Sequence, residues 1–409
     1  MVESRVSVAH PRTDAAPPRA LISTIAWAIA VSLAIVGVSI LLNRVPRQLA
    51  DANLQSDTAW YLAMVSHRWP PTGEHMGIHG VLAPFRYRIL VPFLASLLPF
   101  GPVLSLALVT YASLAGAYVF TLLTSERLGL SKSASACGLL IACTFASPLY
   151  CFRNPLLTDA FGVLTVAAMT YACVVPSFAM FAAWGLVGIF GRETTALILP
   201  AWVLRHPRHT ALLVVVAGVL LVVERLILYA DVPDGSALLS ILWIDVVERV
   251  QYPQRFVADL VVSWGWAFGF FAMGLLLRVR ALKPALPAIF AAAACATITS
   301  IVATDVERYF AILLPAMAIA FAVVVREWMD RRNRVMLLAL TGMTILQFFI
   351  SWPNAIVDES TWKVTFALVP IAKIGALWMA IVAFALRRRL TEAVVHLRRL
   401  GSDTVVRTL

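Results

Sequence analysis

The chain alternates between long apolar stretches and shorter polar segments that hold most of its charged residues. Most apolar stretches run for about 16–22 residues, which suits a helix that crosses a hydrocarbon core of about 30 Å at about 1.5 Å per residue. We therefore expect a series of transmembrane helices. They fall near residues 21–42, 102–124, 133–149, 158–175, 178–190, 194–204, 210–230, 259–277, 285–303, 310–325, 335–350 and 367–386.

Two of these stretches are too short to cross a membrane as straight helices. Residues 178–190 and 194–204 would reach only about 20 Å and 16 Å as α-helices. They predict either a re-entrant hairpin or two short helices, with Gly191, Arg192 and Glu193 below the membrane surface. Neither alternative changes the predicted topology downstream.

The composition supports lipid as the solvent of this fold. The chain is 61% hydrophobic and 13% charged, with a mean hydropathy of +0.85. A soluble domain of 409 residues would expose a largely apolar surface at this composition. Because backbone polar groups must be satisfied within the membrane, the spanning elements are expected to be helices. The predicted fold is all-α and polytopic, with about 10–12 transmembrane helices.

Charge is divided unevenly between the two sets of connecting segments. Alternate connections, beginning with the amino-terminal segment, hold 20 of the 33 Lys and Arg residues and seven of the 22 acidic residues. Because cytoplasmic loops are enriched in Lys and Arg, we expect both termini in the cytoplasm of a multi-pass plasma (inner) membrane protein. The basic segments are 1–20, 125–132, 205–209, 278–284, 326–334 and 387–409.

This orientation predicts three parts of the chain. Residues 1–20 form a disordered cytoplasmic tail, and residues 21–386 form the transmembrane domain, with a large first outer loop at 43–101 that contains interfacial helices. Residues 387–409 form a basic amphipathic helix on the inner leaflet. The net charge of +11 thus reflects orientation and contact with membrane lipids, and nucleic-acid binding is not expected. The five cysteines are expected to be small buried hydrophobic residues.

Charges on the predicted outer side are informative because orientation does not require them there. Ser56 is a suitable helix N-cap, which places Asp57 in the first turn, and Trp60, Tyr61 and Met64 follow at helical spacing. This pattern predicts an interfacial helix with a carboxylate at its start. The alternative is a carboxylate that only complements the helix dipole.

Two further outer segments carry arginines. Arg86 and Arg88 flank Tyr87 between two prolines, and their spacing in an extended segment points both side chains the same way. They are suited to clamp an anion or to anchor at lipid phosphates. Arg192 and Glu193 lie at reduced depth, where charged residues are costly. They predict either a functional site or a structural ion pair in which each neutralises the other.

Three outer acids and one more arginine lie at predicted helix ends. Asp159 follows Asn154 and Pro155, and Asp305 precedes Glu307 and Arg308. Each also suits helix capping. The pair Glu224–Arg225 lies within a predicted helix and is expected to be structural. His75 and His79 are four apart beside Glu74, but the neighbouring glycines disfavour the helix that a metal site there would need.

In the order of these features the chain resembles the GT-C superfamily of polytopic glycosyltransferases, which use polyprenyl-phosphate sugar donors at the outer face. The resemblance rests on Asp57 soon after the first helix, on Phe85-Arg86-Tyr87-Arg88, on Gly191-Arg192-Glu193-Thr194, and on Asp305 to Tyr309. A D-x-D motif is missing from the first outer loop, and the chain is small for the family. The resemblance leaves room for a divalent metal but does not imply one.

The resemblance implies an inverting transfer of a sugar from a polyprenyl-phosphate donor to a lipid or glycan acceptor on the extracytoplasmic side. Asp57 would be the catalytic base, and residues 21–386 would form the catalytic domain. The remaining roles are shared between two groups of residues. Arg86, Arg88, Arg192 and Arg308 would bind the donor phosphate, supported by Tyr61, Tyr87, Asp159, Glu193 and Asp305.

Three alternatives remain open on the sequence. A secondary transporter has a similar number of helices, although such proteins usually carry internal repeats and midplane polar groups. A polymerase or ligase of polyprenyl-linked glycans shares the outer arginines but usually has its large loop later in the chain. An inactive scaffold is the third alternative, and the outer charges disfavour it.

Overall fold

The computed structural model describes residues 18–42, 57–66, 88–229, 263–301 and 306–351, two short strands at 357–358 and 363–364, and isolated positions between 243 and 253 and at 391. This part of the chain is helical apart from the antiparallel strand pair, which confirms the all-helical prediction. Helix α1 begins at Pro18, so the last three residues of the predicted amino-terminal tail are helical. The rest of that tail, the whole predicted helix at 367–386, and residues 387–409 apart from position 391 lie outside the described residues.

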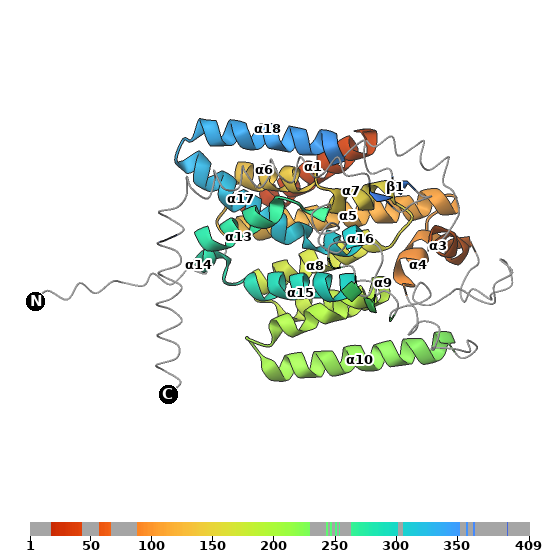
Figure 1. Ribbon diagram of the computed structural model, residues 1–409. Coiled ribbons are helices and arrows are strands. Elements are labelled where there is room, and N and C mark those ends of the chain that lie inside the picture. Colours follow the sequence, from red (N-terminus) through yellow and green to blue (C-terminus); the bar gives the residue numbers. More distant parts are fainter. Residues whose placement is uncertain are drawn as a thin grey trace, which may run out of the picture.

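The order of elements follows the apolar stretches of the sequence (Figure 1). The elements are α1 (Pro18–Leu42), α3 (Asp57–Ser66), α4 (Leu90–Ser96), α5 (Pro102–Arg127), α6 (Lys132–Ala142), α7 (Ala146–Arg153), α8 (Asp159–Val174), α9 (Phe178–Gly191), the 3-10 helix η2 (Glu193–Trp202), α10 (Pro207–Tyr229), α13 (Ala267–Leu277), α14 (Val279–Leu282), α15 (Leu286–Ile301), α16 (Val306–Phe310), the 3-10 turn η3 (Ala311–Leu313), α17 (Leu314–Asp330), α18 (Arg334–Ser351), β1 (Val357–Asp358) and β2 (Lys363–Val364).

Four described segments are long and apolar enough to cross a membrane: Leu21–Leu41, Pro102–Arg127, Pro207–Glu224 and Arg308–Asp330. The bent pair α6 and α7 adds a fifth if it forms one span. Five shorter apolar helices of 10–17 residues accompany them in the described part of the chain. The described part of the chain is therefore helical, with four or five apolar segments able to span a membrane.

The prediction of one straight helix over residues 133–149 is wrong. The structure has two helices there, α6 and α7, bent by 73° at a short break. Pro148 lies in the first turn of α7. Proline is well tolerated there because the N–H groups of the first turn have no carbonyl partner within the helix, so the missing N–H of proline costs no hydrogen bond. Mean hydropathy does not register such a break, because both sides of it are apolar.

Helices α9 and η2 pack against each other as a hairpin, an arrangement that fits both alternatives expected for this stretch. Gly185 lies against Leu199 and Gly188 against Thr195, so the two elements run in opposite directions. Phe178 contacts Trp202 at the open end, with 5.8 Å between ring centroids. Arg192 therefore lies at the tip of the hairpin, and it is completely buried.

Helix α17 forms the centre of the described body. Its buried face contacts α5, α6, α8 and α13, and small residues allow the closest approaches. A Cβ atom at Gly138 of α6 would lie 2.5 Å from the backbone oxygen of Ala318, and one at Gly274 of α13 would lie 2.8 Å from the Cα of Ala320. Small residues at helix contacts are typical of membrane proteins, where close van der Waals packing replaces the hydrophobic effect.

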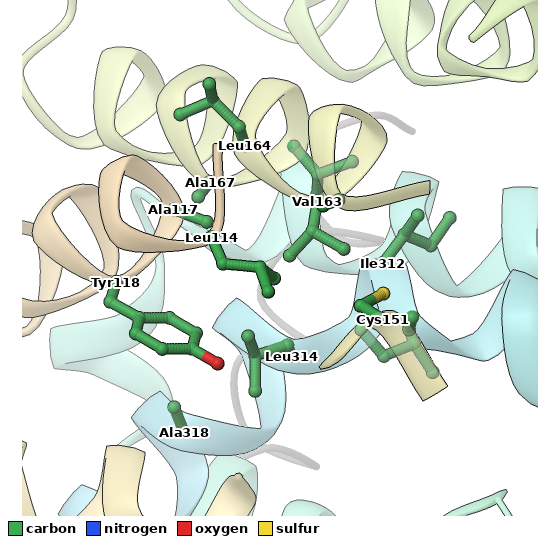
Figure 2. Close-up of a cluster of buried hydrophobic side chains, with 14 of the residues drawn as sticks. Leu114, Ala117, Tyr118, Cys151, Val163, Leu164, Ala167, Ile312, Leu314 and Ala318 are labelled. Carbon is green, nitrogen blue, oxygen red and sulfur yellow. The ribbon is translucent and has the colours of Figure 1, made fainter. Parts of the chain in front are cut away.

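Apolar side chains fill the space where α5, α7, α8 and α17 meet (Figure 2). Leu114 and Tyr118 of α5 face Leu314 and Ala318 of the α17 segment, with Cys151 of α7 close by. Cys143, Cys151, Cys173 and Cys295 are buried, as predicted, whereas Cys137 is exposed, and none of the five forms a disulfide.

The two ends of the body differ in character. At one end, Nη2 of Arg278 lies 3.8 Å from Oδ2 of Asp330, and Nε of Arg331 lies 2.8 Å from Oε1 of Glu327. Figure 1 shows α14 and the turn between α17 and α18 at this end, and α3 and α4 at the opposite end. The described segments predicted to be cytoplasmic and those predicted to be external thus lie at opposite ends.

Candidate functional site

Helix α3 begins at Asp57, where the sequence predicts a helix start. Tyr61, one turn later, is completely buried, and Met64 is 1% exposed. The predicted helix is therefore present, and these two side chains point into the protein body. The Asp57 side chain, Arg86, Tyr87 and Asp305 lie outside the part of the chain whose side chains the structure describes.

Arg88 and Glu193 form a two-point ion pair that joins the segment before α4 to the hairpin tip. The Nε and Nη2 atoms of Arg88 donate to the two carboxylate oxygens of Glu193 at 3.0 and 2.9 Å. The third nitrogen, Nη1, donates to the Tyr61 hydroxyl at 3.2 Å. Thr158 also donates to that hydroxyl, at 3.4 Å. All three guanidinium nitrogens of Arg88 thus have partners.

Asp159 joins two other arginines. It is the first residue of α8 and is 1% exposed. One carboxylate oxygen accepts from Nη1 of Arg192, and the other accepts from Nε of Arg308 at 2.6 Å. Asp159 therefore connects the hairpin tip to the start of the α16–α17 segment. This role goes beyond capping the helix dipole.

Arg192 reaches Asp159 because α8 carries a glycine one turn further on. A Cβ atom at Gly162 would lie 2.8 Å from the Cδ atom of Arg192. The guanidinium carbon of Arg192 lies 4.7 Å from the centre of the Tyr309 ring, within the range of a cation–π contact. Tyr309 and Gly162 were not among the predicted site residues. The pairing of Tyr309 with Arg192 has no local signal in the sequence.

The five charged residues form one group, which we call the arginine cluster: Arg88, Asp159, Arg192, Glu193 and Arg308. Of the sequence-predicted site residues, the structure brings together these five and Tyr61. The alternative in which Arg192 and Glu193 neutralise each other is wrong, because each pairs with a residue from another segment. Arg192 and Glu193 are adjacent at a turn, where neighbouring side chains point in different directions, so each side chain is directed toward a different partner.

Arg192 is the least satisfied member of the arginine cluster. Its Nε and Nη2 atoms are buried and have no hydrogen-bond partner in the part of the chain that the structure describes. A buried donor without a partner costs about 1–3 kcal/mol. The described side chains of the cluster also carry three positive charges against two negative ones, so the group is suited to an anion.

In the sequence, Glu193 lies between the candidate membrane spans Pro102–Arg127 and Pro207–Glu224, and its side chain is 17% exposed. Burial alone would raise the pKa of its carboxyl, but the Arg88 guanidinium keeps that pKa below its ordinary value. The Arg88–Glu193 pair is consequently ionised at neutral pH. Neither Glu193 nor Asp159 is placed to accept a proton from a substrate, because arginines hold both carboxylates.

Within the described residues, no group of three or more His, Cys, Asp or Glu side chains is arranged to hold a metal ion. His75 and His79 lie outside those residues. The described carboxylates of the site are held by arginines and are therefore not free to coordinate a cation.

Comparisons of the chain with protein-family models, with curated protein sequences and with solved structures gave no match.

Proposed function

We propose that this protein is a membrane-embedded glycosyltransferase of the GT-C type that takes a sugar from a polyprenyl-phosphate donor. The observation that carries the proposal is the arginine cluster, with three buried arginines at one end of a helical body. Its members come from four segments for which the charge distribution predicts the same side of the membrane. In this proposal that side is extracytoplasmic, and the shorter apolar helices complete about 10–12 crossings of the plasma (inner) membrane.

The reaction in this proposal is a direct displacement at the anomeric carbon. The acceptor hydroxyl attacks that carbon, the bond from the carbon to the phosphate oxygen breaks, and polyprenyl phosphate leaves as an anion. The acceptor proton passes to a carboxylate base, and the anomeric configuration inverts. Cations fixed near the leaving phosphate would stabilise the charge that develops there, which is often the largest contribution of an enzyme site.

Asp57 is the candidate for the base. It is the first residue of α3, four residues before Tyr61, and residues four apart share one face of a helix. Tyr61 contacts Arg88, so that face adjoins the arginine cluster. A base on α3 would be separate from the carboxylates of the cluster, which the arginines keep occupied.

The experiment measures transfer of labelled sugar in membranes that contain the full chain. The donors are undecaprenyl-phosphate-linked glucose, mannose and arabinose, each supplied with total membrane lipids and glycans as acceptors. We expect transfer from one donor, and Asp57→Asn should lower turnover about 10²–10⁴-fold, the usual contribution of a general base. Asp330→Asn, at the opposite end, is the control and should leave turnover unchanged.

Full activity of the Asp57→Asn protein would exclude Asp57 as the base. Absence of transfer from all three donors in membranes with folded wild-type protein would contradict the proposed activity.

A secondary transporter is the second candidate, and the 73° break between α6 and α7 favours it, because broken helices form binding sites in many transporters. Uptake of a solute into reconstituted vesicles without a covalent product would support the transporter over the glycosyltransferase.

A further inference from the structure

The arginines of the cluster use their guanidinium groups differently. A guanidinium presents its Nε and Nη2 donors along one edge, which matches two oxygens on a single carbon or phosphorus atom. Arg88 uses this edge to hold both oxygens of Glu193. Arg192 uses only Nη1, toward Asp159, and its Nε–Nη2 edge has no partner among the described residues.

The surroundings of Arg192 hold that edge in place. Asp159 fixes one nitrogen, the Tyr309 ring covers one face of the guanidinium, and Gly162 lies against the stem of the side chain. Arg192 is completely buried, and charges interact more strongly away from water. The edge is therefore positioned for an oxyanion, and nearby segments must part to admit one.

We infer that Arg192 alone binds the ligand's phosphate through its Nε–Nη2 edge, and that Arg88 and Arg308 are positioning residues. Arg88 anchors the hairpin tip through Glu193, and Arg308 holds the Asp159 carboxylate that orients Arg192. This inference rests on the proposed function for the identity of the phosphate as a polyprenyl phosphate. In place of several equivalent phosphate-binding arginines, the site then has one arginine that binds the phosphate and two that hold it in position.

The test measures binding of undecaprenyl phosphate, the leaving group of the proposed reaction, to the purified full-length protein in nanodiscs. Undecaprenol is the control without a phosphate, inorganic phosphate is the control without a lipid tail, and lauric acid supplies a carboxylate on a lipid tail. We expect binding of undecaprenyl phosphate and no binding of undecaprenol. Inorganic phosphate should compete weakly, and lauric acid should not compete.

The central variant is Arg192→Lys, which keeps the charge and removes the two-donor edge. We expect it to weaken undecaprenyl phosphate binding about 10–100-fold, with little change in the melting temperature without ligand, because Asp159 keeps Arg308 as a partner. Arg88→Lys should lower the melting temperature without ligand, because Glu193 loses its two-point partner, and should weaken undecaprenyl phosphate binding less than Arg192→Lys does. Arg208→Lys, exposed at the other end, is the matched control.

Unchanged affinity of the Arg192→Lys protein would overturn the inference, as would tighter binding of lauric acid than of undecaprenyl phosphate. If Arg192→Lys does not fold, a structure of the wild-type protein with undecaprenyl phosphate decides the question. Two oxygens of one phosphate at about 2.7–3.0 Å from Nε and Nη2 of Arg192 would support it. A phosphate bound elsewhere would overturn it.

The binding test separates this inference from the proposed activity. Arg192-dependent binding without sugar transfer from any donor would support the phosphate site and contradict the glycosyltransferase. Sugar transfer with an unchanged KM for the donor in the Arg192→Lys protein would support the glycosyltransferase and overturn the role of Arg192.

Discussion

At the residue scale, the buried carboxylate of Asp159 has the largest expected effect on stability, because it serves two arginines at once. Removing one partner of a buried ion pair leaves an uncompensated charge and typically costs 3–5 kcal/mol. The exposed Asp330 also contacts two arginines, Arg278 and Arg326, but water screens these pairs. Exposed pairs contribute about 0–1 kcal/mol.

We therefore predict that Asp159→Asn destabilises the protein by about 3–5 kcal/mol and that Asp330→Asn changes its stability by less than about 1 kcal/mol. The measurement is denaturant unfolding of both variants in the same detergent, followed by tryptophan fluorescence. Equal destabilisation by the two substitutions would mean that burial does not set the strength of the Asp159 pairs.

Residue types at the candidate site were predictable from the sequence, but the partners were not. Arg88, Asp159, Arg192, Glu193 and Arg308 stood out because orientation does not require charges on their predicted side. Arg88 and Glu193 are 105 positions apart and Asp159 and Arg308 are 149 apart, so no local pattern relates them. Their pairing is fixed only when the helices pack.

At the element scale, the contact of α6 with α17 depends on the absence of a side chain at Gly138. The backbone of Ala318 and Ala322 lies within 3 Å of the position that a Cβ atom would occupy at Gly138. Backbone atoms of a packed helix cannot rotate away as a side chain can, so the two helices must separate to admit even a methyl group.

Gly138→Ala should therefore destabilise the protein by about 1–3 kcal/mol, the usual cost of overpacking. Gly218→Ala is the matched control, because a Cβ atom at Gly218 in α10 would have no neighbour within 4 Å. The control should be neutral or stabilising by up to about 1 kcal/mol, since alanine favours helix more than glycine does. Unfolding in detergent compares the two, and a neutral Gly138→Ala would contradict the close contact.

Element boundaries were predicted well where one apolar stretch forms one helix. Residues 102–124 and 285–303 correspond to Pro102–Arg127 and Leu286–Ile301. The break between α6 and α7 and the 3-10 geometry of η2 were not predicted, because local backbone geometry inside an apolar stretch depends on tertiary contacts. Pro148 and Pro200 were the available signals.

At the scale of the whole molecule, the described structure separates a basic end from the end that holds the arginine cluster. Gly101, at the start of α5, and Arg208, at the start of α10, are exposed near opposite ends. The distribution of Lys and Arg predicts that position 208 faces the cytoplasm and position 101 faces outward.

In a Cys137→Ser background, which removes the exposed native thiol among the described cysteines, we predict opposite labelling of Gly101→Cys and Arg208→Cys. A membrane-impermeant maleimide should label the first variant in intact cells and the second only in permeabilised cells. The Cys137→Ser protein without an added cysteine gives the background level of labelling. Labelling of both variants from the same side would contradict the predicted topology.

The central position of α17 has a consequence for how the protein is made. Nearly the whole apolar window of its segment, 94%, is covered by protein, and four of its neighbours, α5, α6, α8 and α13, precede it in the chain. A ribosome that synthesises this chain therefore completes those four neighbours before α17 emerges. Helix α17 can then pack against these four partners as soon as it emerges, and α18, which also contacts it, follows directly in the chain.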